Sequence, residues 1–111
     1  MDVQRKPDPQ IVSELINRIV ETVHPLRIIL FGSSARGEMN ENSDLDVLVI
    51  MPDGVHRRRT AQTIYRGLRG LGFAVDVVVA TPTDIRDYGR NPSLVLYPAI
   101  QEGKEIFYAA K

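Results

Sequence analysis

Hydrophobic residues change their spacing along the chain, and each change predicts an element of secondary structure. Between residues 9 and 23 they recur every three or four positions, which gives an α-helix one apolar face. Asp8 followed by Pro9 predicts the start of this helix, because aspartate caps helix N-termini and the first turn does not need the N–H that proline lacks. The same spacing predicts a second long helix over residues 56–71, with glycines at its end.

Short apolar runs bounded by turn residues predict the strands. They lie at residues 27–31, 44–51, 74–80 and, as an edge strand, 104–108. Weaker patterns predict helical segments at 35–38, 85–88 and 91–101. Within the last of these, Pro98 predicts a kink or a late start, because proline cannot donate a helical hydrogen bond. This order of elements predicts an α/β (α+β) domain in which helices pack against a small mixed sheet.

Length and composition narrow the choice of fold and partner. With 111 residues, we expect a single domain over 1–111 with a flexible segment at 1–7. The 14 basic and 14 acidic residues cancel, whereas proteins that hold long nucleic acids carry a basic excess. The absence of cysteine excludes disulfides, thiolate metal sites and a cysteine nucleophile. Without a long apolar run or a signal-peptide core, we expect a cytoplasmic protein that does not enter a membrane.

Two aspartates open the strand at 44–51. Asp44 and Asp46 are two residues apart in an extended segment, so their carboxylates point to the same side and repel each other unless a cation lies between them. Mg²⁺ binds such oxygen donors, usually together with substrate phosphates. The alternatives are a turn or capping role for Asp44 and a solvent-facing position for Asp46. The apolar neighbours of Asp46 favour the metal, because an unpaired carboxylate among them would be costly.

A second signal precedes the aspartates. Gly32 and Ser33 follow the strand at 27–31, and a turn of this kind can direct backbone N–H groups at a phosphate. Taken alone, it would be interpreted as an ordinary turn between a strand and a helix, but the aspartates that follow favour the phosphate site. Asp76 is a third signal, since it is the single acid within the apolar run AVDVVVA. A single acid in an apolar strand needs a reason, and one would be a basic partner elsewhere in the fold.

In combination these residues carry a resemblance to a known family. Gly32-Ser33, a gap of ten residues and then Asp44-Leu45-Asp46-Val47 resemble the signature of the polymerase-β-type nucleotidyltransferase superfamily. The fuller string resembles the small MNT (minimal nucleotidyltransferase) proteins of prokaryotes through Ala35, Arg36, Gly37 and Ser43. The resemblance implies the nucleotidyltransferase fold and a site with two Mg²⁺ ions and ATP as substrate.

The resemblance also assigns roles to single residues. Asp44, Asp46 and Asp76 would be the catalytic residues and metal ligands, with Asp76 accepting the proton of the attacking hydroxyl. The nucleotide-binding residues would be Gly32, Ser33, Arg36 and Ser43. For Arg36 the alternative is an ion pair with Asp44 or Glu38, and for Ser43 it is a cap on the loop before Asp44.

The family further implies a biological role. Proteins similar to this one form toxin–antitoxin pairs with a HEPN-domain protein, so the resemblance implies AMP transfer from ATP to a tyrosine of that toxin. Because the chain is small, we expect a partner to complete its site. Two alternatives are transfer to a small-molecule hydroxyl, such as an antibiotic, and a non-catalytic module that occludes its partner. We interpret Arg57, Arg58 and Arg59 as a solvated helix face or a protein-binding surface rather than a nucleic-acid site.

Overall fold

The computed structural model describes residues 8–37, 44–91 and 96–109. Its helices are α1 (Pro9–Val23), α2 (Ser33–Arg36), α3 (Arg57–Gly67), α4 (Pro82–Tyr88) and α5 (Leu96–Glu102). Its strands are β1 (Arg27–Phe31), β2 (Leu45–Ile50), β3 (Val75–Ala80) and β4 (Lys104–Tyr108). The bounds predicted for α1, β1 and β4 are confirmed, and those of β2 and β3 differ by one residue at the ends. The expectation of a flexible segment at 1–7 lies outside the described residues.

The predicted bounds of the other helices differ from those in the structure. α2 begins directly after Gly32 rather than at residue 35, and α3 ends at Gly67 rather than at 71. α4 begins three residues earlier than predicted, because Thr81 and Asp84 form a capping box at its N-terminus. For α5 the late start predicted from Pro98 is confirmed: the helix begins at Leu96, so Pro98 lies in its first turn, where a missing N–H breaks no helical hydrogen bond.

The strands form one mixed sheet in the order β3-β2-β1-β4. β1 pairs antiparallel with both β2 and β4, whereas β2 and β3 are parallel and connected through α3. The parallel register aligns Leu45 with Val75 and Asp46 with Asp76. β3 and β4 therefore form the two edges of this sheet, and the starts of β2 and β3 lie side by side.

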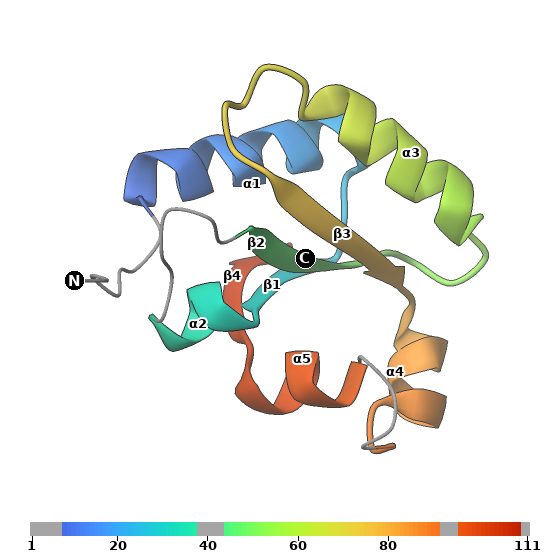
Figure 1. Cartoon of the computed structure of the whole chain (residues 1–111). Coiled ribbons are helices and arrows are strands. Elements are labelled where there is room, and N and C mark those ends of the chain that lie inside the picture. The colour runs from blue at the N-terminus through green and yellow to red at the C-terminus, as the bar shows by residue number, and fades with distance from the viewer. Residues whose placement is uncertain (1–7, 38–43, 92–95, 110–111) are drawn as a thin grey trace.

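Helices cover both faces of the sheet, as Figure 1 shows. On one face, Leu15 and Ile19 of α1 and Ile64 of α3 pack in the same buried cluster as Val47 and Val49 of β2. On the other face, a second cluster joins α5 to the sheet. Its buried members are Ile29, Leu48, Ile50, Ala80, Leu96 and Ala99. Because side chains alternate along a strand, Asp46 shares the second face with Leu48 and Ile50.

An ion pair joins α3 to α4. The Arg57 guanidinium donates two hydrogen bonds of 2.6 Å to the Asp84 carboxylate, whose second role is in the capping box with Thr81. Asp84 is buried, with 7% of its surface exposed. Arg57 therefore has a structural partner, whereas Arg58 and Arg59 of the same basic run are exposed. None of the helices within the described ranges has the length and hydrophobicity needed to cross a membrane.

This pair predicts a pH-dependent contribution to stability. The Arg57 hydrogen bonds lower the pKa of Asp84 in the folded state, so the stabilisation is present above the unfolded pKa of about 3.9 and is lost as the pH falls through the folded pKa. We expect Asp84→Asn to cost roughly 1–2 kcal/mol at pH 7. Thermal melts should show the gap to wild type narrowing below about pH 4. A gap that stays constant down to pH 2 would contradict this assignment.

Candidate active site

The residues predicted to carry the chemistry come together at one end of the sheet. β1 ends there while β2 and β3 begin, and the register places Phe31 and Asp76 on either side of Asp46. Gly32 follows Phe31, and Asp44 immediately precedes β2. Segments separated by some thirty residues in sequence are thus brought together by the pairing of three strands.

The surroundings of the three aspartates differ. Asp46 is half-buried, whereas Asp44 and Asp76 are exposed. The flanking side chains of Leu45 and Val47 point into the core on the opposite face of the sheet, which fixes the side on which Asp46 lies. Asp76 lies on β3, an edge strand, so an incoming molecule can approach it from the open side of the sheet.

These carboxylates interact electrostatically. Burial raises the pKa of Asp46, and the negative charges of Asp76 and then Asp44 raise it further. Arg36 acts in the opposite direction and lowers the pKa of Asp46. The fold thus holds Asp46 in a place where its negative charge is disfavoured, and a bound cation would relieve that cost.

Gly32 lies directly against Asp46. Its φ of +71° is in the left-handed region, and a Cβ built on it would lie 2.5 Å from Asp46 Oδ2. Glycine is therefore needed at this position for two independent reasons, one of conformation and one of space. The same geometry brings the turn backbone and the Asp46 carboxylate to one place, as a site for a metal-bound phosphate requires.

The other residues predicted to bind the nucleotide are Ser33, Arg36 and Ser43. Ser33 is half-buried and begins α2. Arg36 ends α2, is exposed, and forms an ion pair with Glu102 of α5 at 3.7 Å. The sequence did not single out Glu102, because only the tertiary fold brings α5 beside α2. Ser43 and Glu38 lie outside the described residues.

The acidic groups are of the chemical type that binds a hard divalent cation, but they do not form a preformed set of ligands. Across 8–37, 44–91 and 96–109, no group of three or more His, Cys, Asp or Glu side chains is arranged to hold a metal ion. The carboxylates nevertheless lie near enough to one another for their charges to raise the pKa of Asp46. Mg²⁺ commonly takes one or two protein carboxylates and completes its shell with phosphate and water. This donor set therefore fits an ion that arrives with its nucleotide.

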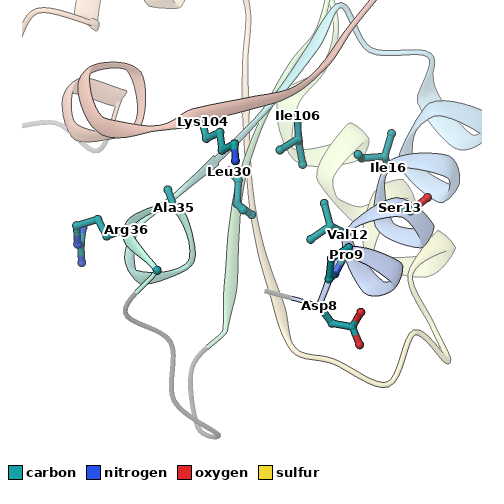
Figure 2. Close-up of a pocket in the computed structure, with 11 residues that line it drawn as sticks. Asp8, Pro9, Val12, Ser13, Ile16, Leu30, Ala35, Arg36, Lys104 and Ile106 are labelled. Carbon is teal, nitrogen blue, oxygen red and sulfur yellow. The ribbon is translucent and has the colours of Figure 1, made fainter. Parts of the chain in front are cut away.

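A cavity of about 630 Å³ lies between α1 and α2. Figure 2 shows its wall of Val12, Ile16, Leu30 and Ile106, with Lys104 beside Leu30. This volume is in the range of small-molecule sites, which are mostly apolar with a few polar groups. The sequence did not predict it, because Lys104 and Ile106 reach this place only through the pairing of β4 with β1.

We expect Gly32→Ala to damage both stability and the site. The substitution adds a methyl group at Asp46 Oδ2 and forces a left-handed conformation on alanine, at a cost of about 1–2 kcal/mol for the backbone alone. Thermal melting measures the loss of stability. Gly54→Ala is a matched control, since Gly54 also has a positive φ but nothing lies within 4 Å of its Cβ position. If Gly32→Ala and Gly54→Ala changed nucleotide affinity equally, the contact between Gly32 and Asp46 would have no functional consequence.

We also expect Asp46→Asn to stabilise the protein when no divalent cation is present. The raised pKa means that ionised Asp46 disfavours the folded state at neutral pH, and this penalty disappears below the unfolded pKa of about 3.9. Melting temperature at pH 7 should therefore rise slightly, by roughly 1–2 °C since solvent screens a half-exposed group. The difference should vanish near pH 3. Asp87→Asn, on α4, serves as the control.

Comparison with known proteins identifies the family to which the chain belongs. The family model described as "Nucleotidyltransferase domain" matches residues 12–100, which include Gly32 and all three aspartates. A solved structure of a Sulfolobus solfataricus protein assigned to the nucleotidyltransferases is 18% identical, with a TM-score of 0.62, over 89% of this chain and 78% of the other. A toxin–antitoxin structure with AMP-PNP is 25% identical, with a TM-score of 0.62, over 88% and 73% respectively. No curated protein matches the chain. With its model matched over most of the sequence, the chain belongs to the nucleotidyltransferase domain family.

Proposed function

We propose that this protein is a Mg²⁺-dependent nucleotidyltransferase that moves AMP from ATP to a hydroxyl group of a partner protein. The observation that carries the proposal is the register that sets Asp46 beside Asp76, with Gly32 against the Asp46 carboxylate. In this reaction the acceptor oxygen forms a bond to the α-phosphorus of ATP. The bond from that phosphorus to the bridging oxygen breaks, and pyrophosphate leaves.

The three aspartates have different roles in this proposal. Asp44, Asp46 and Asp76 would hold the metal, for which up to two Mg²⁺ ions are implied by the motif. When bound, Mg²⁺ supplies positive charge that neutralises the phosphates. Asp76 accepts the proton of the acceptor hydroxyl, and its exposure on an edge strand leaves room for that hydroxyl to approach.

The residues around Gly32 bind the phosphates. The backbone N–H groups of the turn at Gly32 and Ser33 donate to phosphate oxygens, and the missing Cβ of Gly32 lets this turn lie directly against the Asp46 carboxylate. Arg36 would add a positive charge near the phosphates, which is supported by its effect in lowering the pKa of Asp46. Ser43, through its place in the motif before Asp44, is assigned to the same nucleotide site.

Two observations favour ATP and a protein acceptor. The toxin–antitoxin relative was solved with AMP-PNP, an analogue of ATP, and covers most of this chain at the same fold. The motif from Gly32 to Val47 resembles that of MNT antitoxins, which implies a HEPN-domain toxin as partner and one of its tyrosines as acceptor. We therefore propose that the chain acts as an antitoxin that silences its partner by AMP transfer in the cytoplasm.

A small-molecule hydroxyl is the second candidate acceptor. The cavity between α1 and α2 favours it, because a largely apolar space of about 630 Å³ is large enough for a drug-sized molecule. Transfer to small alcohols in the absence of any protein would therefore favour the second candidate.

Intact-mass spectrometry tests the proposal directly. The protein is incubated with ATP, Mg²⁺ and a HEPN-domain protein encoded beside it, and both chains are weighed. We expect one or more AMP additions on the partner, lost in an Asp44→Ala, Asp46→Ala double variant. A stable complex without added mass would overturn transfer in favour of occlusion. Neither complex nor added mass would direct the search to small-molecule acceptors.

Asp76 gives a sharper prediction about the mechanism. We expect Asp76→Asn to lower kcat by at least about 100-fold, since it removes a metal ligand and the proton acceptor together. Nucleotide affinity should change less than kcat, because Asp44 and Asp46 are retained. Pyrophosphate release at varied ATP concentration separates the two quantities, with Asp87→Asn as control. Unchanged kcat would remove Asp76 from the mechanism.

A further inference from the structure

A large part of the positive charge is concentrated on α3. Residues 55–75 contain five of the fourteen basic residues and none of the fourteen acidic ones. Arg57 is occupied by Asp84. The other four, Arg58, Arg59, Arg66 and Arg69, are exposed, and we call them the α3 arginine face. A chain that is neutral overall is therefore strongly positive along one helix.

The helical spacing puts these arginines on one side. At 100° per residue, positions 58, 62, 65 and 66 fall within about a third of the circumference, and 59 lies at the border of that arc, while Arg69 follows just after the end of the helix. Ile64 and Leu68, on the opposite side, are buried in the core. In Figure 1, α3 and α1 form the outer layer over one face of the sheet, so the side of α3 that points away from the sheet faces solvent.

Solvated helix faces usually neutralise their charges locally, as α1 does. There, Glu14 and Arg18 are four residues apart and form an ion pair of 2.9 Å. α3 contains no acidic residue, and within the described ranges no acidic side chain pairs with the α3 arginine face. Like charges gathered on one helix lower its stability slightly. This face therefore differs from an ordinary solvated surface.

The α3 arginine face also borders the strand that carries Asp76. Tyr65 lies on the same side of α3, and its hydroxyl accepts a hydrogen bond of 2.9 Å from the backbone N–H of Val77. Val77 follows Asp76 on β3, which is an edge of the sheet. Asp76, like Asp46, points to the α5 face of the sheet, so a protein that presents a hydroxyl to it and also contacts α3 would wrap around this edge, past Tyr65 and Arg66.

We propose that the α3 arginine face docks an acidic surface of the acceptor protein and orients it toward Asp76. The position of the acceptor rests on the proposed function, whereas the charge of its surface follows from α3 alone. Guanidinium groups bind carboxylates through two parallel hydrogen bonds, as Arg57 already does with Asp84. A nucleic acid fits less well, because the exposed carboxylates Asp44 and Asp76 would repel its phosphates.

Fluorescence anisotropy with two probes tests the proposal without depending on catalysis. One probe is a labelled glutamate-rich peptide with a single tyrosine, and the other is a labelled oligouridine of equal charge. We expect wild type to bind the peptide in a salt-dependent manner, and Arg58→Glu, Arg66→Glu to weaken binding about 10-fold or more. The matched control is Arg86→Glu, Arg90→Glu, which reverses two exposed charges at α4 and should change affinity by less than about 2-fold.

Each other outcome would overturn the inference. Tighter binding of the oligouridine, lost in the same variant, would make α3 a nucleic-acid surface. Equal losses in both double variants would mean that only net charge matters, and no peptide binding would exclude an acidic partner. Pyrophosphate release from ATP and Mg²⁺ is measured separately. Failure of transfer therefore leaves the docking result interpretable, and failure of docking leaves the proposed function standing.

Discussion

The site depends on electrostatic repulsion that the sheet holds in place. Parallel pairing of β2 with β3 sets Asp46 beside Asp76, and burial adds to the cost of ionised Asp46. Only the packing of both sheet faces can maintain such an arrangement, because a flexible segment would let the carboxylates move apart. We propose that this energy is recovered when a cation and a phosphate bind, so that the strained arrangement favours substrate binding.

The rest of the structure supports this arrangement from a distance. α1 and α3 cover one face of the sheet and α5 covers the other, so the strands cannot shift their register without exposing the core. The ion pair between Arg57 and Asp84 joins α3 to α4 at the end of the sheet opposite the aspartates. Gly32 completes the site because any side chain there would displace the Asp46 carboxylate.

Much of this could be predicted from the sequence, because the determinants are local. Hydrophobic spacing predicted α1 and the strands, and the motif from Gly32 to Asp46 predicted the fold family, whereas the roles it assigns to single residues stay predictions. The helix ends were less predictable, since the start of α4 depends on a capping box that Thr81 forms with Asp84. The partners of Arg36 and Arg57, and the cavity beside Lys104, could not be predicted because they join segments distant in sequence.

Calorimetric titration tests the central claim, that the aspartates and the Gly32 turn form one metal–nucleotide site. Mn²⁺, as a probe for Mg²⁺, is titrated into wild type and Asp46→Asn, each with and without a non-hydrolysable ATP analogue. The account predicts that the analogue tightens metal binding to wild type by about 10-fold or more and has little effect in the variant. Metal binding that is equally tight in both proteins, or unaffected by the analogue in wild type, would contradict it.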